Sequence, residues 1–252
     1  MAKQTGILPI EGTIGNITFF KSKDGYMVRS KGGVSASKIA TDAAFQRTRE
    51  NMAEFGRAGK AGKLLRTSLR STIVKAKDNR MVSRLTSQML RVVQADASSD
   101  RGQRNVIDGE AALLEGFDFN SGAKLSSTLY ASYTVTYTRT TGAVQVNIAD
   151  FIPPGMLTTP TGTTHFQLFM AAAAIDFEAT TYDAVSSASG ELVYSNITTG
   201  AITLSAALPA NSTHPVFIIA GIEFLQQVNG KQYSLNNGAF NACSIVKVDS
   251  PV

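Results

Sequence analysis

A glycine-rich, basic run at residues 56–63 is the first segment whose composition suggests chemistry, because it resembles a phosphate-binding loop. A nucleotide-binding P-loop requires a glycine, four residues, Gly-Lys and then a hydroxyl residue that holds Mg²⁺. Here Leu64 follows Gly62-Lys63, and Arg57 stands where the first glycine should be. The preceding sequence also predicts a helix instead of a strand. We therefore do not expect a nucleotide-binding loop.

Side chains suited to catalysis or metal binding are sparse in this chain of 252 residues. There are two histidines, His165 and His214, and no Gly-x-Ser-x-Gly sequence that would present a nucleophilic serine. The single cysteine, Cys243, lies in an apolar strand pattern and is expected to be buried and inert. A cluster of acidic residues lacks calcium-loop spacing, and helix capping by Asp96 or Asp100 accounts for it. We predict no catalytic residue, no metal site, no cofactor and no enzymatic activity, although a triad assembled from distant segments stays open.

Positive charge is concentrated in the first half of the chain. Residues 1–110 contain 20 Lys and Arg against 10 Asp and Glu, whereas residues 111–252 contain 4 against 9. The segment 43–91 alone contains 12 basic and 3 acidic residues. Such an asymmetry favours either a polyanionic partner or head-to-tail contacts between copies of the chain.

The basic region has two interpretations. It contacts DNA or RNA phosphates without reading sequence, or it is a solvated face that pairs with the acidic half of a neighbouring copy. No recognition-helix, zinc-finger or aromatic RNA-binding motif accompanies the charge. The candidate nucleic-acid-binding residues are Arg47, Arg49, Arg57, Lys60, Lys63, Arg66, Arg70, Arg80, Arg84 and Arg91.

The first thirty residues predict a β-hairpin arm. Residues 13–20 and 26–29 are strand-like, and Asp24-Gly25 between them suits a tight turn. A lone hairpin is only marginally stable in water, so the arm must pack on a larger body. That body is the rest of its own chain or a neighbouring copy, and both interpretations stay open. The candidate subunit-contact residues are Ile14, Ile17, Phe19, Tyr26 and Val28.

Helical periodicity follows a small-residue linker. A long helix is predicted to begin at Thr41 or Asp42, and glycines 56, 59 and 62 predict a kink, a break or close approach of another backbone. Further helices are predicted over 78–95 and 101–115. The predicted apolar face of the long helix comprises Phe45, Met52, Phe55, Gly59, Leu69 and Ile73. That of the second helix comprises Met81, Val82, Leu85, Met89, Val92 and Val93.

From residue 117 the period of the apolar residues changes from helical to two. This pattern predicts strands near 129–138, 144–148, 164–177, 191–196, 201–206, 215–228, 231–235 and 240–248, with turn signals such as Asn229-Gly230. The predicted fold class is α+β. It comprises a β-hairpin arm with its linker at 1–40, a basic helical region at 41–116, and an antiparallel β-sandwich, immunoglobulin-like or jelly-roll-like, at 117–252.

No segment predicts a membrane span or a signal peptide. The longest apolar runs, 166–177 and 216–222, fall short of the roughly 18 residues that cross a bilayer. The first residues lack the basic-then-apolar run of a secretory signal. We therefore expect a cytoplasmic protein, or one in a particle assembled in the cytoplasm.

Several short segments together resemble an uncharacterised protein family common in Bacteroidota genomes. They are residues 12–20, 24–26, 45–51, 54–60, 80–85 and 101–105, and the similarity extends through 164–166 and 237–241. This resemblance implies a bacterial or bacteriophage setting and assigns no functional residue.

These observations favour a non-enzymatic, self-assembling structural protein, such as a subunit of a filament, a tube or a virion-like shell. Its copies would be joined by strand exchange through the arm and by complementary charge between the halves. The alternative is a nucleic-acid-binding protein that uses the basic helical region without sequence specificity. The expected partners are therefore copies of the chain itself, with DNA or RNA as the alternative.

Overall fold

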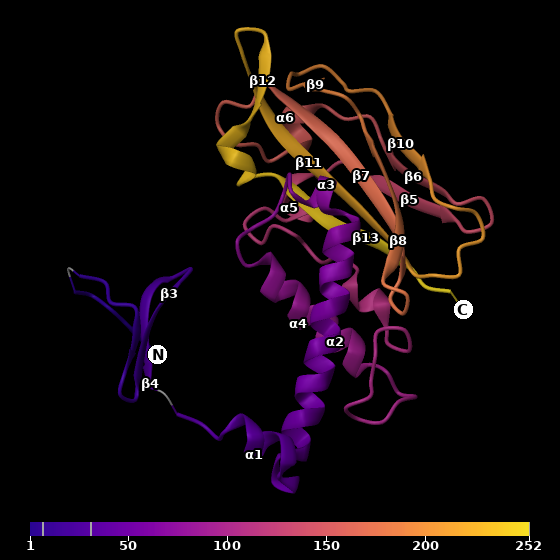
Figure 1. The fold of residues 1–252 in the computed structure, drawn as a ribbon. Coiled ribbons are helices and arrows are strands. Elements are labelled where there is room, and N and C mark those ends of the chain that lie inside the picture. The colour runs from indigo at the N-terminus through magenta and orange to yellow at the C-terminus, as the bar shows by residue number, and fades with distance from the viewer. Residues whose placement is uncertain (7, 31, 252) are drawn as a thin grey trace. The chain divides into compact units, whose positions relative to one another are not determined.

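The computed structural model describes residues 1–6, 8–30 and 32–251, and it divides into two compact units, Met1–Arg49 and Glu50–Val252 (Figure 1). The predicted divisions at residues 40 and 116 follow composition, whereas this division follows packing. In the second unit, the helices and the central strands pack together around a shared hydrophobic core.

The first unit contains a four-stranded antiparallel sheet, so the predicted hairpin has one further strand on each side. The order is β1-β4-β3-β2. Ser22 pairs with Gly25, whose φ is 107°, and the tight turn therefore contains Lys23 and Asp24. A second turn at Gly15 divides the predicted first strand in two. The elements are β1 (Ala2–Lys3), β2 (Gly12–Ile14), β3 (Ile17–Ser22), β4 (Gly25–Ser30), α1 (Ala36–Thr41) and the 3-10 turn η1 (Ala43–Phe45).

The long helix, α2 (Gln46–Ser68), runs through all three glycines without a break, and a short α3 (Arg70–Ile73) follows it. Its predicted apolar face is wrong in the first half, because Met52 and Phe55 are 61% and 56% exposed. The buried side consists of Glu54, Ala58, Ala61, Gly62, Leu65 and Ser68. Small residues suit the packing of this helix against the core, but they give only a weak hydrophobic pattern in the sequence. The later predicted positions, Leu69 and Ile73, are buried.

The helix α4 (Met81–Gln94) buries its predicted face except for Val82, which is 43% exposed. The predicted third helix is wrong, and only the 3-10 turn η2 (Ala111–Leu114) forms there. Instead, side-chain carboxylates accept hydrogen bonds from backbone N–H groups of this segment. Glu54 accepts the N–H of Gly102 at 2.7 Å, and Asp96 accepts the N–H of Asn105 at 3.1 Å. Asp96 therefore holds a loop and caps no helix.

The remaining strands form two antiparallel sheets, which confirms the α+β class with β-sandwich character. One has the order β12-β11-β7-β8, with β13 beside β11 and β9 beside β7, and the other has the order β10-β6-β5. The strand β8 was not predicted, because most of its side chains are exposed and polar. The strands are β5 (Tyr133–Thr138), β6 (Ala143–Ile148), β7 (His165–Asp176), β8 (Thr181–Ala188), β9 (Leu192–Val193), β10 (Ile202–Ala207), β11 (Val216–Val228), β12 (Lys231–Ser234) and β13 (Ala242–Asp249). Short helical turns are α5 (Leu125–Thr128), α6 (Pro153–Met156) and η3 (Leu235–Gly238).

The central strands β7 and β11 are buried on both faces. Phe169, Ala171 and Ala173 of β7 belong to the core that contains α2 and α4. The alternate residues, such as Leu168 and Met170, belong to a second core shared with the three-stranded sheet. The second unit therefore has three layers, with helices on one side of the central sheet and strands on the other. Cys243 is buried as predicted, and burial raises the pKa of its thiol.

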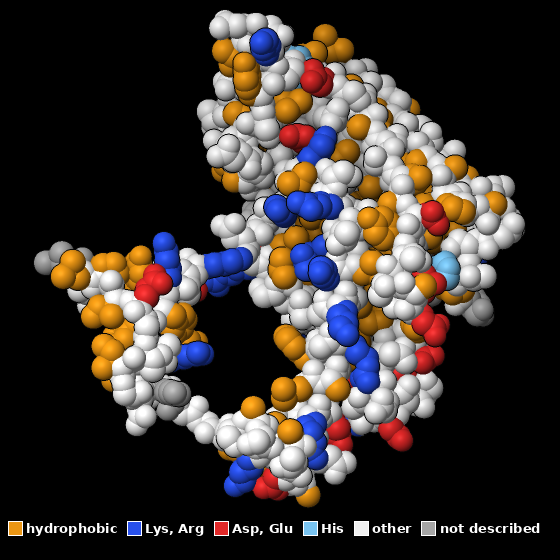
Figure 2. All heavy atoms as spheres, viewed as in Figure 1, with side chains coloured by type: hydrophobic (Ala, Val, Ile, Leu, Met, Phe, Trp, Pro, Cys, Tyr) orange, Lys and Arg blue, Asp and Glu red, His pale blue; other side chains and the backbone are white. Residues whose placement is uncertain are grey.

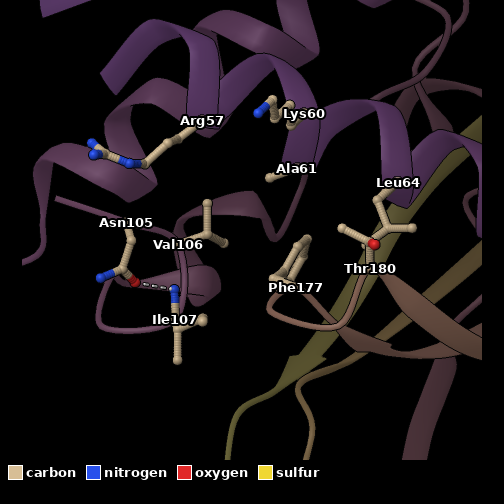
Figure 3. Close-up of a pocket in the computed structure, with 9 residues that line it drawn as sticks. All are labelled: Arg57, Lys60, Ala61, Leu64, Asn105, Val106, Ile107, Phe177 and Thr180. Atoms are coloured by element: carbon tan, nitrogen blue, oxygen red, sulfur yellow. Dashed lines mark hydrogen bonds between the residues drawn. The ribbon is translucent and has the colours of Figure 1, made fainter. Parts of the chain in front are cut away.

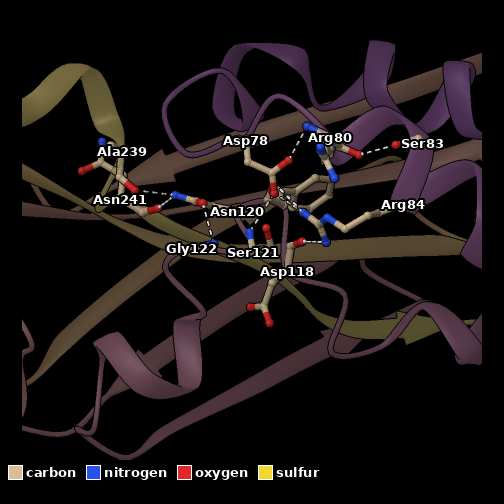
Figure 4. Close-up of polar contacts among 11 residues, drawn as sticks. Asp78, Arg80, Ser83, Arg84, Asp118, Asn120, Ser121, Gly122, Ala239 and Asn241 are labelled. Carbon is tan, nitrogen blue, oxygen red and sulfur yellow. Dashed lines mark hydrogen bonds and ion pairs between the residues drawn. The ribbon is translucent and has the colours of Figure 1, made fainter. Parts of the chain in front are cut away.

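A polar network joins the helical layer to the sheet (Figure 4). Asp78, before α4, forms an ion pair with Arg84 at 2.6 Å and accepts the Ser121 N–H at 2.8 Å. Burial opposes ionisation of Asp78, but these hydrogen bonds outweigh it and lower its pKa to about 2. Next to it, Asn120 donates to the carbonyl of Asn241, whose own amide donates to the Lys75 carbonyl.

We expect Asp78→Asn to lower the melting temperature at pH 7, because the neutral amide loses the charge-assisted contacts. A depressed pKa stabilises the folded state fully above the unfolded-state value of about 4, and this contribution is lost as the pH falls through about 2. The difference between variant and wild type should therefore shrink across that range. Thermal unfolding followed by circular dichroism tests this, with the exposed Asp183→Asn as control. A pH-independent difference would contradict the assignment.

Gly221 on β11 lies where a side chain has no room. A Cβ there would lie 2.4 Å from the Ala242 carbonyl oxygen and 2.4 Å from the Phe169 ring. We expect Gly221→Ala to destabilise the protein by about 1–3 kcal/mol in urea unfolding. Gly56→Ala is the matched control: no atom lies within 4 Å of its Cβ position, and this helical site should gain about 1 kcal/mol. Equal effects at both positions would contradict the packing described.

Candidate assembly surfaces

All five predicted subunit-contact residues lie on one face of the N-terminal sheet, which we call the N-terminal apolar face: Ile14, Ile17, Phe19, Tyr26 and Val28. Directly opposed residues in antiparallel strands share a face, as do residues two apart on one strand. Ile14 pairs with Ile17, and Phe19 pairs with Val28. Tyr26 pairs with Lys21, which follows Ile17 and Phe19 on the same side of β3. The strand register thus gathers the five into one surface.

Within the described residues of the first unit, no second layer covers this face. Among the described residues of 1–49, no side chain is buried. Ile14 is 65% exposed and Ile17 is 44% exposed, while Phe19, Tyr26 and Val28 are half-buried. The backbone of the sheet is hydrogen-bonded, but its apolar side chains remain in contact with water.

The opposite face of the sheet is more polar. Thr13 and Thr18 lie 3.2 Å apart through their hydroxyl oxygens. The Arg29 guanidinium stands over the Phe20 ring at 5.3 Å and shields part of that ring. The opposite face thus mixes polar side chains with Phe20 and Met27, whereas the N-terminal apolar face is mainly aliphatic and aromatic, with Lys21 over the Tyr26 ring at 5.5 Å.

A second exposed apolar surface lies on α2 and consists of Met52, Phe55, Gly56 and Gly59; we call it the α2 stripe. At about 100° per residue, its members lie within roughly 100° of one another around the helix. Neither Gly56 nor Gly59 has an atom within 4 Å of its Cβ position. The stripe thus combines two large apolar side chains with flat, open backbone.

Most of the predicted nucleic-acid-binding residues make contacts within the protein. Arg49 donates to the carbonyls of Ile39 and Asp42, and Arg66 donates to the Gly62 carbonyl. The residues Arg47, Arg80, Arg84 and Arg91 also have protein partners. These side chains therefore also hold backbone and neighbouring side chains, and their contact with nucleic acid stays a prediction.

Lys60, Lys63 and Arg70 differ because, among the described residues, their side chains have no hydrogen-bond or ion-pair partner. All three are exposed; Lys60 and Lys63 lie about 60° apart around α2, and Arg70 begins α3. Figure 2 shows Lys and Arg side chains following this part of the molecule. We call Lys60, Lys63 and Arg70 the cationic stripe; it is the part of the predicted basic region whose side chains are exposed and have no described partner.

A small cavity of about 140 Å³ lies beside the cationic stripe and has an apolar lining that includes Leu64, Val106 and Phe177 (Figure 3). Arg57 stands at its edge but turns its guanidinium away, donating to the carbonyls of Gly102 at 2.7 Å and Arg104 at 3.1 Å. Arg57 therefore holds the loop that was predicted as a helix and is not aimed at a ligand.

The histidines occupy different places. His165 contacts the Thr164 hydroxyl at 3.0 Å. His214 lies 3.8 Å from a carboxylate oxygen of Asp176 in a cavity of about 470 Å³ that Glu110 and Glu178 also line. The sequence did not predict that these acidic residues lie together, because the chain folds four distant segments around the cavity. Among the described residues, no side-chain hydroxyl is hydrogen-bonded to the His214 ring.

No protein-family model and no curated protein sequence matches this chain. Among solved structures, it is similar to a chain described as "pH-induced modulation of Streptococcus parasanguinis adhesion by Fap1 fimbriae", with 11% identity over 54% of this chain and 95% of that one, at a TM-score of 0.24. It is also similar to a human F-spondin reeler domain, with 13% identity over 50% and 99% of the two chains, at a TM-score of 0.19. Likenesses this weak carry no argument about function. Within the described part of the chain, no helix is both long and apolar enough to cross a bilayer.

The contacts of Arg57 and Lys60 predict different effects of mutation. We expect Arg57→Gln to destabilise the protein by about 1–3 kcal/mol, because two charge-assisted hydrogen bonds to the 102–104 loop are lost. Lys60→Gln, one turn away and exposed, should change stability by less than about 0.5 kcal/mol. Urea unfolding of the two variants checks this. Equal stability of both would show that Arg57 does not hold the loop.

Proposed function

We propose that this protein is a non-enzymatic, self-assembling structural subunit whose N-terminal apolar face docks on the α2 stripe of a neighbouring copy. The observation that carries the proposal is a hydrogen-bonded four-stranded sheet with no buried side chain among its described residues. A sheet in water requires a second layer against its apolar face, since hydrogen bonds alone leave it marginal.

The chemistry of the two surfaces supports their pairing. The N-terminal apolar face offers aliphatic and aromatic side chains, and the α2 stripe offers Met52 and Phe55 beside open glycine backbone. A helix packed across a sheet is a common two-layer arrangement, and glycine permits close approach. Burial of apolar area drives such association at about 25 cal/mol per Å² before the costs of ordering are counted.

The geometry of the contact defines the kind of assembly. The N-terminal apolar face (the donor surface) and the α2 stripe (the receiving surface) are different parts of the chain. Each copy would therefore place its own N-terminal apolar face on one neighbour and receive the face of another neighbour on its α2 stripe. Such heterologous contacts close into rings or propagate as filaments. Charge supports the same arrangement, because the cationic stripe of one copy can face the acidic β half of the next.

Complementary variants test this proposal. Ile17→Gln with Phe19→Gln removes the donor surface, and Met52→Gln with Phe55→Gln removes the receiving surface. Each double variant should be folded by circular dichroism and, by light scattering, should form nothing larger than a dimer. Mixed, the two variants should form a larger complex than either alone, because each supplies the surface that the other lacks. The matched controls are Thr18→Gln, on the opposite face of the sheet, and Val74→Gln, an exposed apolar position outside the stripe; both should assemble like wild type.

Several results would overturn the proposal. If the sheet packs on its own chain, the wild type forms nothing larger than a dimer and mixing the variants changes no mass. Assembly beyond a dimer that persists in both double variants would place the propagating contact elsewhere. A wild-type monomer that retains nucleic acid at low salt, and loses it when Lys60, Lys63 and Arg70 are changed to Gln, would favour the phosphate-binding alternative. The absorbance ratio at 260 and 280 nm identifies that outcome directly.

A further inference from the structure

One edge of the strand β5 has no hydrogen-bonded strand partner among the described residues. β5 is the outer strand of the three-stranded sheet, and β6 is its hydrogen-bonded strand partner. Among the described residues, no ladder joins β5 to any other strand, and β13 approaches it only locally. Exposed edges normally carry charged residues, proline or bulges that block pairing with another chain. β5 carries none of these, whereas β8 contains Asp183 and β12 contains Lys231.

The sequence of β5 is palindromic over residues 133–137, which read Tyr-Thr-Val-Thr-Tyr. Antiparallel pairing with an identical strand, centred on Val135, would place Val135 opposite Val135 of the second copy. Thr134 would lie opposite Thr136, and Tyr133 opposite Tyr137. Every residue would therefore face one of its own type, and aromatic pairs and threonine pairs stabilise neighbouring strands.

The side chains of β5 are arranged for such pairing. Val135 and Tyr137 face the core shared with β6 and are only half-buried, as at an open edge. Thr134 and Thr136 point to the other face and are exposed. A second β5 beside the first would cover the half-buried row and continue the sheet from three strands to six.

We infer that β5 pairs antiparallel with β5 of a second copy, about a two-fold axis at Val135. This isologous contact deepens the proposed function and rests on it for its role in a larger assembly. A two-fold contact joins copies in pairs, whereas the heterologous contact of the N-terminal sheet propagates them. The two together would build a paired filament or a double-walled ring.

Cysteine variants of the full chain test the register. The Val135→Cys variant places two thiols directly opposite, within the Cα separation of about 4.4–6.8 Å that a disulfide spans. Under mild oxidation it should form covalent dimers on a non-reducing gel. Thr136→Cys is the matched control, because its thiol faces Thr134 of the other copy and should not pair with itself. The native Cys243 is buried, so wild type gives the background.

A second pair of variants tests the inference at exposed positions, where folding is less affected. The Thr134→Cys and Thr136→Cys variants should each stay monomeric on the gel, whereas an oxidised mixture of the two should show several-fold more dimer than either alone. Equal cross-linking of all variants, or no cross-linking of Val135→Cys and of the mixture, would overturn the inference. Assembly without these cross-links would leave the N-terminal contact standing, and cross-links in the docking-deficient variants would support the β5 contact alone.

Discussion

The structure depends on the burial of β7 and β11 on both faces. These strands pair over ten positions, from Val216 with Ala174 to Leu225 with His165. Their side chains alternate between a core shared with the helices and a core shared with the three-stranded sheet. A strand pair that is apolar on both sides cannot face water on either, so it requires a covering layer on each face. The three-layer architecture of the second unit follows from that requirement.

The helical layer is packed through small residues and held by polar anchors. The buried side of α2 includes Ala58 and Ala61, Gly62 lies against Leu85 of α4, and the buried carboxylate of Glu54 accepts the Gly102 N–H. The Asp78–Arg84 pair and the buried amide of Asn120 connect the helical layer to the loops that line β13. Since buried polar groups are costly unless they are hydrogen-bonded, these anchors define one arrangement of the layers.

The first unit differs because, among its own described residues, no second layer covers the apolar face of its sheet. Its strands have paired backbones, yet Ile14 and Ile17 are exposed within that unit. The proposed assembly rests on this contrast. In the second unit both apolar faces of the central sheet are covered, whereas in the first unit the apolar face of the sheet is not covered by residues of that unit. In the three-stranded sheet, the edge of β5 without a strand partner has the same significance as the uncovered apolar face of the first unit. An apolar face and an open edge are the two ways in which a β-sheet recruits another chain.

The sequence by itself determined the elements whose pattern depends on one covering layer or on a local turn. The face of α4 and the turn at Asn229-Gly230 were predicted from spacing alone, since an amphipathic period and a positive-φ glycine are local signals. The five candidate subunit-contact residues were also chosen from the strand pattern; the register places them on one face, and their part in a subunit contact stays a prediction.

Only the tertiary structure decided the face of α2, the loop at 101–110 and the strand β8. Alanine marks the buried side of α2, but Met52 and Phe55 dominate its hydrophobic pattern. The loop is held by Glu54 and Asp96 from other segments, which replace the backbone bonds of a helix. β8 is a polar edge strand that pairs with β7 through its backbone, and a backbone partner leaves no trace in side-chain periodicity.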